Sequence, residues 1–129
     1  MALGIFDERT VLVQQVLMVP ADGVATKVIV AANSSDRRID ALMVANRDGI
    51  AHVVNVTMVF GGITVQLGSV SIPAGQGYAG TPSLDLLVQV LPATQVGINL
   101  PPTATLNVVL SVAIVATFDV SFCAIGGVF

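Results

Sequence analysis

HVVNVTMVF (His52–Phe60), Gly61-Gly62 and ITVQLGSVSI (Ile63–Ile72) make up the stretch that decides the fold. Two runs rich in β-branched residues are joined by a two-residue glycine link, which suits a primed β-turn. Pairing across this turn makes one face of the hairpin wholly apolar and leaves the other largely polar. The apolar pairs would be Phe60 with Ile63, Met58 with Val65, and Val56 with Leu67. The stretch therefore predicts a hairpin with one face over a core.

Further β-rich runs lie on both sides of this hairpin, separated by turn residues at intervals of roughly ten residues. They predict strands at Val11–Val19, Thr26–Ala32, Ile39–Asn46, Gln95–Leu100, Thr103–Val115 and Thr117–Ala124. Within this set, Leu106–Phe118 is apolar on both faces, so we expect a second cover there, from a neighbouring subunit. The total of about eight short strands predicts an all-β fold, an antiparallel β-sandwich or jelly roll.

One short helix is expected near residues 82–91. Thr81 would be its cap and Pro82 its first residue, and apolar residues then recur at helical spacing. The same residues also alternate, so a strand remains the alternative. Asp85 would lie favourably in the first turn of this helix. We divide the chain into an N-terminal arm, residues 1–10, and a single β-sandwich domain, residues 11–129.

The composition indicates a protein that assembles with something. Of the 129 residues, 54% are hydrophobic and only 10% are charged, whereas soluble domains carry about 25% charged residues. Eleven of the 13 charged residues lie in residues 1–48. The net charge is −3 and the chain has five basic residues. This leaves too little positive charge to contact the phosphates of a nucleic acid, which argues against nucleic-acid binding.

A membrane does not explain this hydrophobicity. A spanning helix needs about 20 apolar residues, and the best run, Leu106–Phe118, is shorter and rich in Val and Ile, which favour strands. An outer-membrane barrel would show aromatic girdles, but the chain has no Trp and one Tyr. We therefore expect no membrane partner.

The sequence offers little for catalysis, cofactors or metals. Gly75–Gly80 matches the letters of a dinucleotide fingerprint, but the expected helix starts after the motif and the acidic residue about 20 positions further on is absent. His52 is the only histidine, and we expect it to be a surface or partly buried polar residue. Cys123 is the only cysteine and should be a small buried side chain. We predict no enzyme, no cofactor and no metal site.

Charged residues occur at two further places of interest, Asp119 and the loop that contains Arg37 and Arg38. Asp119 should face solvent or a subunit boundary. Arg37 and Arg38, between Asp36 and Asp40, form a mixed-charge loop that is either a solvated turn or an inter-subunit salt-bridge site.

The stretch from Ile39 to Phe129, about 70% of the chain, resembles small β-sandwich structural proteins of tailed bacteriophage particles. The pattern is a strand, a Pro-Ala-Gly turn, a Pro-led apolar helix and a Pro-x-x-Ala-Thr-Leu return strand. The segments that carry it are Val53–Phe60, Val70–Gly75, Gly80–Leu87 and Leu100–Leu106. The resemblance implies a protein that decorates a capsid or sits at the neck or tail and acts by binding.

The leading hypothesis is a virion structural protein, assembled in the host cytoplasm, that decorates and cements a phage head. Its partners would be copies of itself, with a trimer favoured, and the major capsid protein or neighbouring virion proteins. The alternatives are a neck, collar or tail protein that forms a ring, and a jelly-roll module that binds a small ligand or carbohydrate. Candidate interface residues are Leu3, Ile5, Phe6, Arg37, Arg38, Val128 and Phe129.

Overall fold

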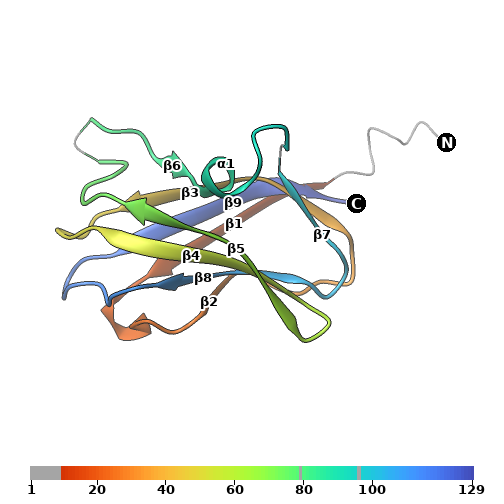
Figure 1. Ribbon diagram of the computed structural model, residues 1–129, viewed down its shortest axis with the longest axis horizontal. Helices are drawn as coiled ribbons and strands as arrows, with labels where there is room; N and C mark the ends of the chain where they lie inside the picture. Colours follow the sequence, from red (N-terminus) through yellow and green to blue (C-terminus); the bar gives the residue numbers. More distant parts are fainter. Residues whose placement is uncertain (1–9, 79, 96) are drawn as a thin grey trace.

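The computed structural model describes residues 10–78, 80–95 and 97–129, and this part of the chain forms two antiparallel sheets packed face to face (Figure 1). Within the described residues there are nine strands and one short α-helix. The first sheet holds β1 (Thr10–Met18), β9 (Val120–Val128), β3 (Arg37–Asn46), β6 (Leu84–Asp85) and β7 (Ile98–Leu100). The second holds β2 (Lys27–Val30), β8 (Thr105–Leu110), β4 (His52–Phe60) and β5 (Ile63–Ile72). The predicted all-β sandwich is confirmed.

The first sheet is built on β9, which pairs with β1 on one side and with β3 on the other. Strand alternation turns Val120, Phe122 and Ala124 of β9 into the core, where all three are buried. The residues between them face outward. A bulge in β3 between Ile39 and Ala41 shifts the alternation of the strand by one residue. As a result, Leu42 and every second residue after it point toward the core.

The hairpin of the second sheet has the predicted strand limits, His52–Phe60 and Ile63–Ile72. Gly61 and Gly62 both have positive φ, as a primed turn requires. The predicted register holds from Phe60 opposite Ile63 to Thr57 opposite Gln66, and then a bulge shifts it. Val56 pairs with Gly68, so the predicted pair of Val56 with Leu67 was wrong.

Gly68 is needed at this place because α1 (Leu86–Val90) packs on it. A Cβ on Gly68 would lie 2.8 Å from Cγ1 of Val90. The helix also starts later than predicted. Asp85 is its N-cap and accepts a hydrogen bond from the Leu87 amide, while Thr81 lies in the preceding loop and binds backbone atoms there. A two-residue strand, β6, takes the place of the first predicted helical turn.

The long predicted strand Thr103–Val115, with its apolar run Leu106–Phe118, was wrong in its second half. β8 ends at Leu110, and residues 111–119 form a loop before β9. Leu106, Val108 and Leu110 point into this chain's own core and are buried there. The core therefore accounts for these three residues, whereas Val112, Val115 and Phe118 in the loop are exposed.

Candidate interaction surface

The outer face of the first sheet carries apolar side chains in a regular grid. The strand registers define four rows that run across β1, β9 and β3. The rows are Val11, Gly127 and Arg38; Val13, Ile125 and Ala41; Gln15, Cys123 and Met43; and Leu17, Ser121 and Ala45. We call these twelve residues the outer grid. Arg38 is the single charged residue among them.

Several residues of the outer grid are strongly exposed. Val11 is 75% exposed, Leu17 is 52% exposed, and Val13 and Ile125 are exposed as well. Arg38, at one corner, forms an ion pair with Asp40 (Nε to Oδ1, 2.8 Å). The outer face of the second sheet is more mixed, because polar pairs such as Asn55 with Ser69 and Thr57 with Gln66 lie beside exposed valines such as Val53. The outer grid, with a single charged residue among twelve, has the character of an interaction site.

A groove of about 510 Å³ crosses the last two rows of the outer grid. Its lining includes Gln15, Leu17, Met43, Ser83 and Cys123. Cys123 is half-buried and belongs to this outer face, so the prediction of a buried core thiol was wrong. The outward phase of β9 explains the difference, since Phe122 and Ala124 occupy the inward positions on either side.

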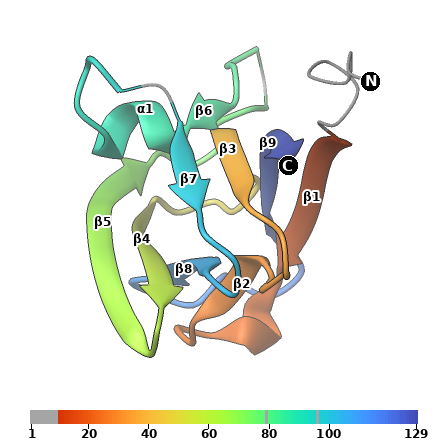
Figure 2. The ribbon, with the colours of Figure 1, turned by 90° about the vertical axis from the view of Figure 1, so that its right-hand side faces the viewer.

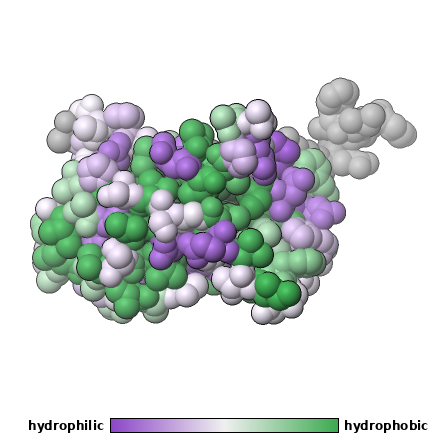
Figure 3. All heavy atoms as spheres, in the orientation of Figure 1, coloured by the Kyte–Doolittle hydropathy of each residue, from purple (hydrophilic) through white to green (hydrophobic). Residues whose placement is uncertain are grey.

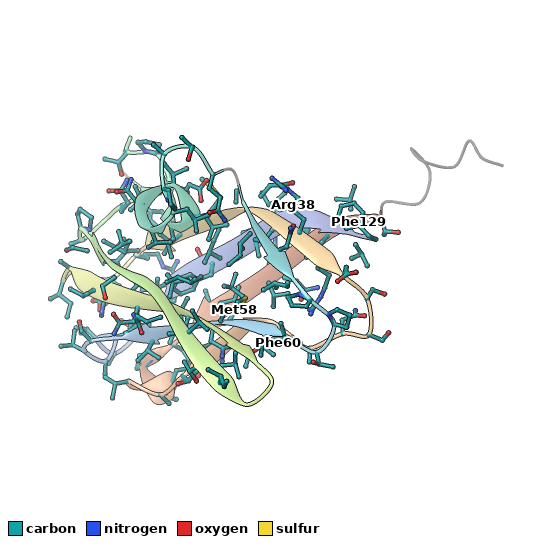
Figure 4. The ribbon with its side chains drawn as sticks, turned by 45° about the vertical axis from the view of Figure 1, so that its right-hand side comes forward. Arg38, Met58, Phe60 and Phe129 are labelled. Atoms are coloured by element: carbon teal, nitrogen blue, oxygen red, sulfur yellow. The ribbon has the colours of Figure 1, made fainter. Side chains whose placement is uncertain are left out.

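A second apolar surface lies at the tip of the β4–β5 hairpin. Ile63 is 67% exposed, and Phe60 and Val65 are also exposed. The spheres at the lower right of Figure 3, where Figure 1 draws the hairpin tip, are hydrophobic. Figure 4 shows Met58 and Phe60 along β4 toward this tip. The hairpin extends past β8, whose last partner on β4 is Val59, so less of the sandwich covers the tip.

The candidate interface residues at the C-terminal end have different environments. Phe129 is exposed and its amide donates to the Asp36 carbonyl, and Figure 4 places it near Arg38. Both residues line a hollow of about 460 Å³. Val128 is half-buried and packs against the core. Leu3, Ile5 and Phe6 lie outside the described residues.

Arg37 is a correction: its side chain is 2% exposed and is not part of a surface loop. It is the first residue of β3 and points inward, in phase with Ile39. Its guanidinium donates to four backbone carbonyls, those of Ala31, Ser35, Pro101 and Ala104. Burial lowers the pKa of the guanidinium, and the charge of Asp36 opposes this change. Arg37 fastens two connecting loops together and cannot form an inter-subunit salt bridge.

His52 is also a correction, because it is fully buried. Its Nε2 lies 2.8 Å from Oδ2 of Asp48, and the same oxygen accepts a hydrogen bond from the Val115 amide. Nδ1 of His52 has no partner among the described residues. A His–Asp pair can serve a general base, but both side chains of this pair are buried. Its role here is to hold residues 111–119 against the start of β4.

Because the pKa of Asp48 is shifted, the stability that this pair gives to the fold should depend on pH. Burial raises the pKa of the carboxyl, but hydrogen bonds from Val115, His52 and Gly49 outweigh it and hold the pKa below its usual range. A lowered pKa stabilises the fold above the ordinary value of about 3.9, and that contribution is lost as the pH falls through the folded-state pKa. We expect the melting temperature to fall steeply below about pH 4. Asp48→Asn should flatten this fall.

Melting curves by circular dichroism between pH 7 and pH 3 test this prediction. Asp22, whose carboxyl accepts from Val19 and binds Lys27, also has a lowered pKa, so the wild-type curve alone does not isolate Asp48. The difference between wild type and Asp48→Asn does, with Asp36→Asn at an exposed position as the control. Equal acid sensitivity of wild type and Asp48→Asn would contradict the prediction.

The remaining sequence candidates have structural roles. Asp119 is buried and forms an ion pair with Arg47, so it does not face solvent, and the alternative of a subunit boundary stays a prediction. Gly75 and Gly77 have positive φ in a loop that Thr81 holds through its hydroxyl group. Among the described residues, no three side chains of the metal-binding types come together.

The outer grid was missed by sequence reasoning although a signal was present. β1 was predicted as a strand, but its residues are mostly apolar in both phases of the alternation, Leu12 and Met18 inward and Val11, Val13 and Leu17 outward. Leu106–Phe118 shows the same double-sided pattern, but its second half, residues 111–118, is a loop rather than a strand.

Neither the protein-family models nor the curated proteins provide a relative of this chain, so its function is inferred from these surfaces. None of the helices in the described part of the chain has the length and apolar character needed to cross a membrane.

Proposed function

We propose that this chain is a non-enzymatic structural protein of a tailed-bacteriophage virion, and specifically a decoration protein that stabilises the head through apolar contacts. The outer grid is the observation that supports this proposal. It is a nearly uncharged sheet face, crossed by a groove, of the kind that a neighbouring protein covers. The virion itself is proposed from the resemblance of residues 39–129 to phage sandwich proteins.

The mechanism would be burial of apolar surface at contacts repeated over a lattice. Apolar burial contributes about 25 cal/mol per Å², and a standard interface covers about 800 Å² on each partner. Repetition of one modest contact on many copies multiplies the effect as avidity. The partners proposed are further copies of this chain and the major capsid protein.

Localisation on particles tests the proposal. In tailed particles whose genome encodes the chain, an antibody against it should label the head surface, and mass spectrometry should find many copies per particle. Labelling confined to the neck or tail would favour the ring-forming alternative. Absence from the particles would overturn the virion proposal.

The ligand-binding alternative would use the groove over Gln15, Met43 and Cys123. Sugar-binding sites commonly present aromatic faces. The aromatic residue that lines this groove, Phe122, is turned into the core and buried. The described geometry therefore favours a protein partner over a carbohydrate.

A matched pair of valines tests the role of the outer grid. Val11, in the grid, is 75% exposed, and Val88, on α1, is 70% exposed. We expect Val11→Glu to reduce self-association and particle occupancy, because it places a charge in the apolar contact. Val88→Glu should leave both unchanged. Each substitution should change the free energy of unfolding by less than about 0.5 kcal/mol, as surface changes usually do.

Native mass spectrometry and a particle-binding assay give the two readouts. Equal losses in both variants would point to general solubility effects rather than a defined contact. Full assembly of Val11→Glu would show that the outer grid is not the interface.

A further inference from the structure

β1 is the long open edge of this sandwich. Among the described residues it pairs with β9 alone, over nine residues from Thr10 to Met18. Figure 2 shows β1 at one margin and α1 beside β5 at the opposite margin. The other edges are short or partly covered: β2, β6 and β7 have four, two and three residues, and α1 packs on β5.

The sequence of β1 carries none of the usual protections of an exposed edge. Natural edge strands are blunted by charged residues, proline, bulges or a covering element. TVLVQQVLM, residues 10–18, contains no charged residue, proline or glycine, and its pairing with β9 is continuous without a bulge. An unpaired row of backbone amides and carbonyls beside such side chains is a template for another strand.

We propose that β1 pairs in antiparallel fashion with β1 of a second copy of this chain, around a twofold axis at Gln14. The absence of charge lets the strand lie opposite itself without repulsion. A twofold axis perpendicular to the sheet keeps the outer face outward in both copies, so outward residues must oppose outward residues. Full overlap of the nine residues then sets Gln14 opposite the partner's Gln14.

This register joins the two outer grids into one surface. Val11 lies opposite the partner's Leu17, and Val13 lies opposite the partner's Gln15. The exposed apolar residues of both copies then form a continuous band over a sheet that runs from one β3 through both β1 strands to the other β3. Gln14, whose side chain is exposed, has its amide beside the identical amide of the partner at the axis.

The expected contact has a definite size and symmetry. Nine paired residues make a seam of about 30 Å. Because a stable interface needs about 800 Å² per partner, the side chains beside the seam on both faces must contribute. A twofold contact gives an even number of copies, unlike the trimer expected from the sequence. The inference rests on the proposed function in that both require self-association.

A single cysteine at position 14 tests the axis, because only a residue on a twofold axis meets its own copy. The background is Cys123→Ser, which removes the one native cysteine. Directly opposed strand residues have Cα atoms about 4.5–5.5 Å apart, within the range that a disulfide spans. Under mild oxidation we expect Gln14→Cys to form covalent dimers in most molecules. Val11→Cys and Leu17→Cys should link poorly alone and well when mixed.

A charge exchange at the same position gives a second readout. Gln14→Lys and Gln14→Glu should each weaken self-association about fivefold, because like charges would lie directly opposite. An equimolar mixture of the two should restore it as a heterodimer. Since Gln14 is exposed, neither variant should lose its fold, which circular dichroism checks.

The outcomes separate this inference from the proposed function. An oligomer that links best at another position, or through the hairpin tip, would overturn the β1 axis and leave the assembly proposal intact. A wild-type chain that stays monomeric at all concentrations would overturn both. If deletion of residues 1–9 converts a monomer into a β1-linked dimer, the segment covers its own β1 edge in the full chain, and the inference fails for that chain.

Discussion

Gly126→Ala is expected to remove a large part of the stability of the sandwich, so that the variant unfolds at a far lower urea concentration than the wild-type chain. Gly126 lies in β9, between Leu12 of β1 and Ile39 of β3. A Cβ at this position would lie 1.8 Å from the carbonyl oxygen of Arg38 and 3.0 Å from Cα of Ile39. Both atoms belong to the backbone of β3, so no side-chain rotation relieves the clash.

The cost should be a large part of the total stability. Either β3 must separate from β9 or the bulge at Ile39–Ala41 must rearrange, and both changes disturb the middle of the first sheet. We expect a loss of more than about 4 kcal/mol, out of the 5–15 kcal/mol that typical domains possess. Far-UV circular dichroism and urea unfolding at fixed protein concentration would measure it, since the chain has no Trp.

Gly49→Ala is the matched control. Nothing lies within 4 Å of a Cβ built on Gly49, and its backbone is not in the positive-φ region. This variant should unfold at the same urea concentration as wild type or slightly higher. A folded Gly126→Ala protein with an unchanged midpoint would contradict the crowding of β9 against β3.

The local part of the fold was predictable because local chemistry determines it. The β4–β5 hairpin has the predicted limits, since alternation and the Gly61-Gly62 turn act on adjacent residues. The bulge at Leu67 could not be predicted in this way. It lies where Gly68 lets α1 approach, and that contact joins segments about twenty residues apart.

The buried polar residues show where such reasoning stops. Asp36-Arg37-Arg38 looks like a solvated turn by composition, yet Arg37 begins a strand and is buried. The carbonyls that bind it belong to residues on both sides, up to Ala104, so no pattern within residues 33–40 reports them. His52 is similar, because Asp48 is near in sequence but Val115 reaches the same carboxylate from another loop.

Arg37→Met should be the second strongly destabilising substitution, at about 3–5 kcal/mol. Methionine fills much of the volume but donates no hydrogen bond. The carbonyls of Ala31, Ser35, Pro101 and Ala104 would then lose their guanidinium donors, and each buried unsatisfied group costs about 1–3 kcal/mol. Removing the charge recovers some desolvation energy, which keeps the expected loss below the sum of the four.

Arg38→Met provides the comparison at the next residue of the same strand. Arg38 is half-exposed and its ion pair with Asp40 is a surface pair, for which losses of about 0.2–1 kcal/mol are usual. Arg37→Lys should fall between the two, because an ammonium keeps the charge but cannot reach four carbonyls with a planar fork of donors. Urea unfolding of the three variants gives the order directly. If Arg37→Met unfolds no earlier than Arg38→Met, the guanidinium does not fasten the loops, and the surface role first inferred for Arg37 from its sequence would have to be reconsidered.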